Sequence, residues 1–343
     1  MTRKKINVAL QGGGAHGAFT WGALDVLLAD DRVDIAGISG TSAGALNGAA
    51  VKAGLAQSGT QAARDNLTWL WEQVAGVQDM RMVSWIAHFG PAHISHALEY
   101  SPAYAVGDAL GRMVSPYAYG PFYRNPLTDI VGKFNMERVC CDDGPQLFIN
   151  ATRVRNGKLR VFRQEEVTPE VIMASACLPT LFQAVTVYDS ETEQDEEFWD
   201  GGYTGNPALF PLFDASLPDD IVVININPLE RETLPRTPQQ IQNRINEISF
   251  NSSLLREMRA ISFVKRLIDE GTMQEGQMRR INMHMIADDD LMNDLSVATK
   301  IVPNGYIMGT LRDAGARAAQ DFLDRHFDRI GTGDSIDMRE MFS

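Results

Sequence analysis

A serine with one glycine two positions before it and another two positions after it is the first candidate for chemistry. Gly40-Thr-Ser42-Ala-Gly44 lies between the apolar run Ile35–Ser39 and the alanine-rich segment Ala43–Ala56. A G-x-S-x-G pattern between a strand and a helix predicts a sharp turn whose glycines let the two elements approach closely. The turn presents the serine hydroxyl at a helix N-terminus, where a developing alkoxide is stabilised. The pattern favours Ser42 as a nucleophile over the alternative, a strand-to-helix turn with a capping serine.

A glycine-rich turn lies upstream of this serine, in the stretch Gln11–Gly17. It matches G-x-G-x-x-G at Gly12, Gly14 and Gly17, and Asp34 follows about twenty residues later, as in dinucleotide-binding units. Its backbone N–H groups, at a helix N-terminus, would stabilise a pyrophosphate or the oxyanion of an acyl-transfer intermediate. The motif alone leaves nucleotide binding, oxyanion stabilisation and a purely structural turn open. The serine turn on the next strand favours the oxyanion, because a nucleotide-binding unit has no use for a second such turn.

A serine hydroxyl also needs a base within hydrogen-bonding reach. Asp200-Gly201-Gly202 ends a short strand-like stretch, and the two glycines allow a sharp turn that leaves the carboxylate unshielded. Taken alone, this tripeptide also fits a simple hairpin turn. A Ser-Asp-His order would instead use His284 or His326, but both lie in segments that resemble ordinary helix or loop, with no motif around them. Asp200 is therefore the better candidate base.

Together these motifs resemble the patatin-like phospholipase family of lipid acyl hydrolases. The resemblance covers roughly residues 6–230 and rests on the order and spacing of the segments Gly12–Gly17, Gly40–Gly44, Asn150–Thr152, Ala174–Pro179 with Phe182, and Asp200–Gly202. The C-terminal third resembles a bacterial subgroup of the family but carries no catalytic pattern.

The resemblance implies a Ser–Asp dyad without histidine on a three-layer α/β/α fold. By this resemblance Ser42 is the nucleophile, Asp200 is the base and later the acid, and Gly12, Gly13 and Gly14 supply oxyanion-hole N–H groups. No metal or cofactor is implied. Many members carry Arg or Lys where this chain has His16, so His16 is either a pH-dependent substitute for that charge or a packing residue.

The elements that must position these residues alternate between strand and helix. Short apolar runs at Ile6–Leu10 and Ile35–Ile38 each precede a helical segment, and 221–226 is strongly β-branched. This alternation predicts an α/β fold with a mainly parallel central sheet and right-handed crossovers. Further segments are predicted as a strand pair (147–152 and 159–163), an acidic solvated turn (189–197), a helical stretch (238–280) and a last helix (305–326).

We find no linker or repeat and expect a single hydrolase domain over residues 1–330. Within it, 77–124 is an irregular insertion rich in methionine and aromatic residues, and 238–330 is mainly helical. The insertion is either packed on the core or an apolar cap over a substrate cleft, for which such side chains are suited. Residues 331–343 are expected to form a loosely held tail.

The composition limits the partners. The 343 residues carry 31 Lys+Arg against 44 Asp+Glu, a net charge of -13 that disfavours nucleic acid. Nowhere do about 18 apolar residues run uninterrupted, so we expect no transmembrane helix. Cys140, Cys141 and Cys177 are too few and too poorly spaced for a disulfide framework or a zinc site. Reduced thiols predict a cytoplasmic protein, with at most peripheral contact with a lipid surface.

Several functions remain compatible with this pattern. The principal expectation is a serine lipid acyl hydrolase acting on a lipid or other acyl ester. The alternatives are a Ser-His-Asp esterase, a thioesterase or polyester depolymerase acting away from membranes, and a non-catalytic lipid-binding protein. The sequence does not distinguish among phospholipids, lysophospholipids, glycerides, thioesters and polyesters, and it leaves the oligomeric state open.

The negative charge generates a prediction about lipid surfaces. Contact must come from an apolar face, so we expect weak binding to neutral vesicles that does not change with salt. Co-sedimentation with neutral and with anionic vesicles, each at low and high salt, measures this. Strong binding to anionic vesicles that disappears at high salt would contradict the prediction.

Overall fold

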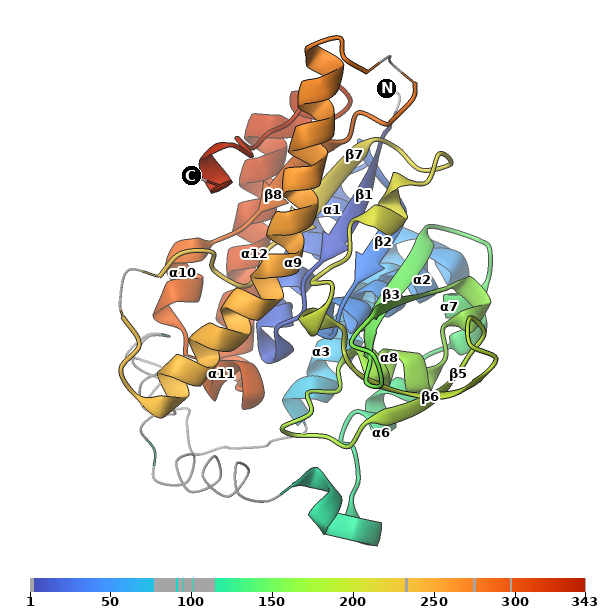
Figure 1. The fold of residues 1–343 in the computed structure, drawn as a ribbon, viewed down its shortest axis with the longest axis vertical. Helices are drawn as coiled ribbons and strands as arrows, with labels where there is room; N and C mark the ends of the chain where they lie inside the picture. The colour runs from blue at the N-terminus through green and yellow to red at the C-terminus, as the bar shows by residue number, and fades with distance from the viewer. Residues whose placement is uncertain are drawn as a thin grey trace.

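A mainly parallel β-sheet forms the centre of the computed structural model (Figure 1). The structure describes residues 3–76, 91, 95, 101, 115–231, 234–273, 276–296 and 298–342. Within these ranges the sheet has eight strands in the order β5-β6-β3-β2-β1-β7-β8, and β4 also pairs with β3. Their bounds are β1 Lys4–Leu10, β2 Val33–Gly40, β3 Gln146–Arg153, β4 Leu159–Arg163, β5 Val185–Asp189, β6 Gln194–Asp200, β7 Asp220–Ile224 and β8 Asn282–Ile286.

The strand pairing confirms the predicted α/β class. Strands β3, β2, β1, β7 and β8 run parallel, and β4, β5 and β6 add antiparallel pairs at the β3 side. All five residues of β7 are buried, as expected for a central parallel strand covered on both faces. Because successive side chains alternate between faces, Val222 and Ile224 join one core cluster, while Ile221 and Val223 join another.

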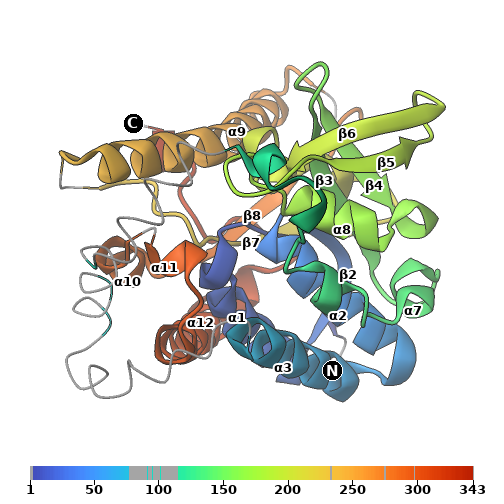
Figure 2. The same ribbon diagram turned by 90° about the horizontal axis from the view of Figure 1, so that it is seen from below.

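Helices cover both faces of the sheet. Figure 2 shows α1, α2, α3 and α12 on one side and α9 on the other. The longer helices span α1 Gly17–Ala29, α2 Ala43–Ser58, α3 Thr60–Gly76, α8 Pro169–Ser175, α9 Pro238–Asp269 and α12 Gly305–His326. The shorter ones are α6 Thr128–Val131, α7 Met136–Cys140, α10 Asp289–Asp294 and α11 Ala298–Ile301. In the described part of the chain, none of the helices is long and apolar enough to cross a membrane.

The acidic run at 189–197 contains the expected turn, at 190–193 and mostly exposed, but its two ends belong to the strands of a β-hairpin. Asp189 ends β5 fully buried, and β6 begins at Gln194. The Asp189 carboxylate accepts hydrogen bonds from Arg160 Nε at 2.9 Å and from Arg153 Nε at 3.1 Å. Two guanidinium groups neutralise the carboxylate, so it can be buried at a strand end.

Two other predicted segments are only partly described. Most of the insertion at 77–124 lies outside the described residues, so the predicted apolar cap stays a prediction. Its last part, the 3₁₀ segment η4 (Pro116–Phe122), packs near β5, where the Tyr117 hydroxyl accepts a hydrogen bond from Ala184 N at 3.0 Å. The tail was expected to be loosely held, but the Asp334 carboxylate accepts hydrogen bonds from Lys265 Nζ at 2.6 Å and Met283 N at 2.7 Å. These bonds attach the first part of the tail to α9 and β8.

The buried ion cluster of the hairpin generates a stability prediction. Asp189→Asn leaves Arg153 and Arg160 without their shared buried charge, which should lower the free energy of unfolding by about 3–5 kcal/mol. Urea denaturation measures the effect. Asp195→Asn, at an exposed position of the same hairpin, is the matched control and should change stability little. An equally small effect of both substitutions would contradict the prediction.

Candidate active site

Ser42 occupies a strained turn between β2 and α2. Its backbone angles are φ 55° and ψ -119°, a left-handed conformation that is uncommon for residues other than glycine. The side chain lies at the N-terminal end of α2 and is 8% exposed. Such strain persists only where the surrounding structure holds it, and it is concentrated at functional sites.

The two glycines of the serine motif are required by close backbone contacts. A Cβ on Gly44 would overlap the Leu10 carbonyl oxygen at the end of β1, and one on Gly40 would lie 2.5 Å from the Gly44 carbonyl oxygen. Any larger residue at either position would push α2 away from the sheet. The spacing of the motif therefore reflects the packing of this turn.

Neighbouring polar residues fix the serine turn. Ser42 N donates a hydrogen bond to Ser175 Oγ at 2.9 Å, and Ser175 is fully buried at the end of α8. Asn150 Nδ2 donates to Thr41 Oγ1 at 3.0 Å, and Thr41 Oγ1 donates to the Gly205 carbonyl at 2.8 Å. These bonds give Asn150 and Ser175, noted in the sequence only as parts of motifs, a role in positioning the serine.

Asp200 lies next to the serine turn because of the strand order. It ends β6 opposite Ala151 of β3, and β3 is the neighbour of β2. The Asp200 carboxylate accepts a hydrogen bond from Gly202 N at 2.7 Å, and the Ser42 hydroxyl lies close enough to lower the pKa of the carboxyl group. A Cβ on Gly201 would overlap the Asn150 carbonyl oxygen, so the glycine after the aspartate lets this turn lie close to β3.

The Asp200 carboxyl group is buried without a positively charged partner among the described residues that contact it. Asp200 is 1% exposed, and burial raises the pKa of its carboxyl group to about 7, although the Gly202 N–H and the nearby Ser42 hydroxyl act in the opposite direction. A carboxylate with a pKa near neutrality is a much stronger base than an exposed aspartate. This site therefore places a serine hydroxyl beside a carboxyl group whose pKa suits a proton acceptor near neutral pH.

The glycine-rich turn packs directly against the serine. A Cβ on Gly12 would lie 2.7 Å from Ser42 Cβ. Gly12 N–H already donates to Asn206 Oδ1 at 2.6 Å, so it is not free for an oxyanion. Within the described residues, the N–H groups of Gly13 and Gly14 donate no hydrogen bond. These two glycines form the start of the 3₁₀ turn η1 (Gly14–His16), which precedes α1. The remaining motif glycine, Gly17, allows α1 to approach α2 closely, because its Cβ would lie 2.7 Å from Ala43 Cβ.

His16 is a buried residue of this loop. It is fully buried, and its Nε2 lies 2.7 Å from Thr299 Oγ1. Burial, followed by the positive charge of Lys300, holds the pKa of the imidazole well below its usual value. The ring is therefore neutral at physiological pH, which favours the packing interpretation over a pH-dependent cation.

The alternative bases lie away from Ser42. His284 is in β8, three strand spacings from β2, or about 14 Å. Its ring nitrogens lie 3.0 Å from Asp220 Oδ1 and 3.0 Å from Ser335 Oγ. His326 is the last residue of α12, and the carbonyl of Phe327, the residue after it, accepts a hydrogen bond from Lys4 Nζ. Lys4 begins β1, whereas the glycine-rich turn follows the other end of this strand. The strand order therefore disfavours a Ser-His-Asp triad that uses His284 or His326.

The position of Asp34 argues against the dinucleotide-binding alternative. Asp34 is exposed near the start of β2, opposite Lys5 of β1, whereas the glycine-rich turn follows the other end of these strands. Gly40 lies six positions after Asp34, which corresponds to about 20 Å along a strand. Asp34 is thus too far from the turn to bind a ribose whose phosphates the turn would hold.

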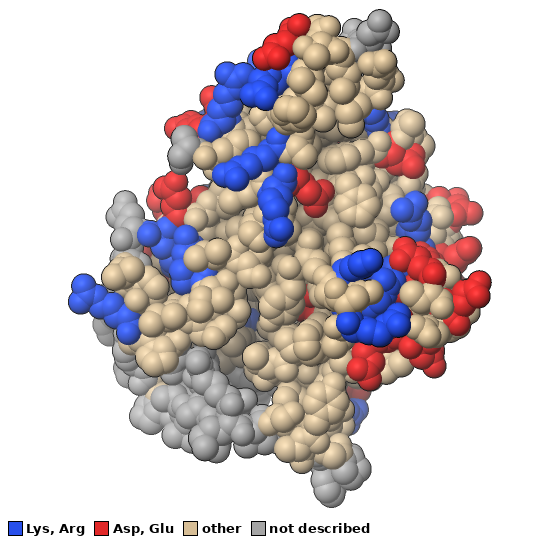
Figure 3. Space-filling view, viewed as in Figure 1, with Lys and Arg blue, Asp and Glu red and all other residues tan. Residues whose placement is uncertain are grey.

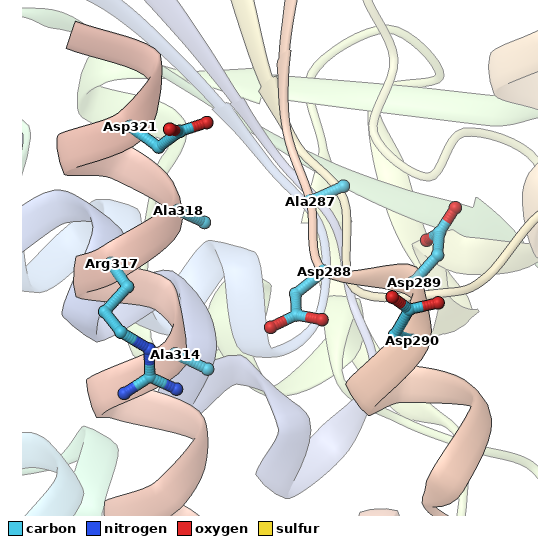
Figure 4. A pocket seen from close by; sticks show the side chains of 8 residues that line it. All are labelled: Ala287, Asp288, Asp289, Asp290, Ala314, Arg317, Ala318 and Asp321. Carbon is cyan, nitrogen blue, oxygen red and sulfur yellow. The ribbon is translucent and has the colours of Figure 1, made fainter. Parts of the chain in front are cut away.

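Acidic side chains surround one cavity outside these motifs (Figure 4). It has a volume of about 420 Å³ and lies between α12, which contributes Arg317 and Asp321, and the Asp288–Asp290 stretch that opens α10. None of the motif residues lines it. In the described part of the chain, no three His, Cys, Asp or Glu side chains are grouped to hold a metal ion.

Comparisons with known proteins were consistent with the motifs. A model of the family described as patatin-like phospholipase matches residues 8–213, more than half of the chain, and this range contains Ser42 and Asp200. The chain matches no curated protein. Among solved structures, it is similar to VipD from Legionella pneumophila at 13% sequence identity and a TM-score of 0.41, over 94% of this chain and 67% of that one.

The buried carboxyl group generates a prediction about pH and stability. Because the folded-state pKa of Asp200 is about 7 and lies above the unfolded value, the folded protein binds this proton more tightly. Its contribution to stability is therefore lost as pH rises toward 7 and beyond. Asp200→Asn should stabilise the protein at pH 8 by up to about 4 kcal/mol and much less at pH 4.5.

Thermal unfolding from pH 4.5 to pH 8.5 measures this difference. Asp34→Asn, which changes an exposed aspartate on β2, is the control and should follow the wild type. A difference in Tm between Asp200→Asn and the wild type that stayed constant or shrank with rising pH would contradict the prediction.

Proposed function

We propose that this chain, which belongs to the patatin-like phospholipase family, is a serine hydrolase that cleaves acyl esters of lipids with a Ser42–Asp200 dyad. The observation that carries the proposal is the position of the Ser42 hydroxyl, at a strained turn beside the buried Asp200 carboxyl group, whose pKa it influences. The strained serine turn and the glycine-rich loop packed against it support the same assignment.

Acylation would begin with proton transfer from Ser42 to Asp200. As Ser42 Oγ attacks the ester carbonyl carbon, its proton moves to the carboxylate and the carbonyl oxygen becomes negatively charged. The raised pKa makes the carboxylate a capable acceptor near neutral pH. Collapse of the tetrahedral intermediate breaks the ester bond, and the protonated Asp200 returns the proton to the departing alcohol.

The glycine-rich loop would stabilise the oxyanion. Gly13 and Gly14 are the proposed donors, because Gly12 N–H is already occupied by Asn206. The N-terminus of α2, where Ser42 lies, adds a favourable dipole. Removal of one donor of this kind typically costs about 3 kcal/mol of transition-state stabilisation.

Deacylation would repeat the same steps with water. Asp200, ionised again, accepts a proton from a water molecule as its oxygen attacks the acyl-enzyme carbonyl, and Ser42 leaves as a hydroxyl when a fatty acid is released. The proposed substrates are phospholipids, lysophospholipids or other acyl esters met in the cytoplasm or at a lipid surface. The free thiols of Cys140, Cys141 and Cys177 are consistent with a reducing compartment.

Replacement of the nucleophile tests the proposal. Ser42→Ala should lower ester hydrolysis by at least about 10³-fold, because it removes the proposed nucleophile. Fatty acids released from a panel of lipid classes should be quantified for the wild type, for Ser42→Ala and for Ser58→Ala. Ser58 is an exposed serine at the other end of α2, so its variant should retain activity.

A fluorophosphonate probe supplies an independent readout. It should label the wild type at Ser42 and leave Ser42→Ala unlabelled. Hydrolysis that persists in Ser42→Ala would refute the dyad, and a wild type that binds lipid but is never labelled would point to a non-catalytic lipid-binding protein.

A further inference from the structure

The peptide group between Gly12 and Gly13 is hydrogen-bonded on its carbonyl side. Gly12 O accepts a hydrogen bond from Asn227 Nδ2 at 2.8 Å and a longer one from Asn206 Nδ2 at 3.4 Å. The N–H of the same planar group is that of Gly13, one of the proposed oxyanion donors. A donor that holds the carbonyl oxygen therefore fixes the direction of the Gly13 N–H and polarises it, which strengthens it as a donor.

The Asn227 side chain is itself fixed in one orientation. Asn227 is 1% exposed and follows β7, the neighbour of β1. Its Oδ1 accepts a hydrogen bond from Lys300 Nζ at 2.9 Å, while its Nδ2 also donates to Gln11 Oε1 at 3.1 Å. A flipped amide would turn its NH₂ group toward an ammonium that has only donors. Lys300 thereby selects the orientation in which Asn227 donates to the Gly12 carbonyl.

Lys300 belongs to a buried charge cluster beside the loop. Its side chain is 12% exposed, and its Nζ lies 3.5 Å from Glu247 Oε1. Glu247 is also paired with Arg231, at 2.7 Å, and with Arg244, at 3.4 Å. Three cations thus surround one carboxylate, and the cluster carries a net positive charge in a protein whose total charge is -13.

The backbone of helix α11 at Lys300 lies against the glycine-rich loop. A Cβ on Gly14 would overlap the Lys300 carbonyl oxygen, and Gly14 has φ 58°. The side chain of Thr299, the preceding residue, contacts His16. Helix α11 therefore packs directly on the turn that contains the proposed oxyanion donors.

We propose that Lys300 and Asn227 are positioning residues for the oxyanion loop. Lys300 orients the Asn227 amide, and Asn227 holds and polarises the Gly12–Gly13 peptide so that the Gly13 N–H receives the developing oxyanion. This inference rests on the proposed acyl hydrolase function. It connects Lys300 of α11, through Asn227, to the Gly13 N–H in the turn that follows the first strand.

Two substitutions separate positioning from stability. Lys300→Met removes the cation, while Glu247 keeps Arg231 and Arg244. Asn227→Asp preserves a partner for Lys300 through an ion pair but has no N–H to donate to Gly12 O. Lys265→Met is the matched control, because Lys265, on α9, is another buried lysine and is paired with the carboxylate of Asp334.

Enzyme turnover is the first readout. The turnover number kcat should be expressed per Ser42 labelled by a fluorophosphonate, so that misfolded protein does not count. We expect kcat to fall about tenfold in Lys300→Met and about 10²-fold in Asn227→Asp, with KM nearly unchanged, as for a weakened or lost oxyanion interaction. Lys265→Met should lower Tm without changing kcat.

The second readout does not depend on turnover. In protein labelled with ¹⁵N-glycine, the amide resonance of Gly13 should move upfield in proton shift in Lys300→Met and Asn227→Asp, and stay in place in Lys265→Met. An unmoved Gly13 resonance, or a normal kcat per labelled serine in Asn227→Asp, would overturn the positioning role while leaving the dyad intact. Activity that survives Ser42→Ala would overturn the dyad and the catalytic role of the loop together.

Discussion

The site depends on the close approach of two strand-to-helix turns at the carboxyl ends of β1 and β2. A Cβ on Gly12 would lie 2.7 Å from Ser42 Cβ, and one on Gly44 would overlap the carbonyl oxygen of Leu10. Parallel pairing of β1 with β2 places both turns at the same edge of the sheet. The serine hydroxyl, the proposed oxyanion donors and the N-terminus of α2 all take their positions from this approach.

Charge is distributed unevenly over the molecule. Lys and Arg side chains are visible along α9 in Figure 3, although acidic residues outnumber basic ones in the whole chain. Inside, the buried Asp200 carboxyl group has no cationic partner among the described residues, whereas Glu247 is surrounded by three cations and has its pKa lowered to about 2. The first arrangement suits the proposed base, and the second gathers positive charge beside the loop.

The strained backbone of Ser42 and the buried carboxyl group of Asp200 both lower the stability of the fold. The left-handed conformation of Ser42 costs about 1–3 kcal/mol, and burial of an unpaired carboxylate adds to it. Hydrogen bonds that Asn150 and Asn227 donate, and that Ser175 and Asn206 accept from backbone N–H groups, hold these groups in place. Strain and desolvation thus coincide at the proposed dyad, as is common at functional sites.

The sequence by itself determined what is local. The glycines around Ser42, the Asp200 turn and the alternation of strand and helix are read over a few residues, and they sufficed for the α/β class and for the family, both confirmed. Tertiary structure decided what joins distant segments. It placed Asp200 beside Ser42 through the strand order, buried Asp189 between two arginines where the sequence favoured a solvated turn, and engaged Gly12 N–H with Asn206. It also brought Lys300 and Asn227 to the first turn. The physical reason is that hydrogen bonding, burial and desolvation between residues far apart in the chain exist only once the sheet has assembled.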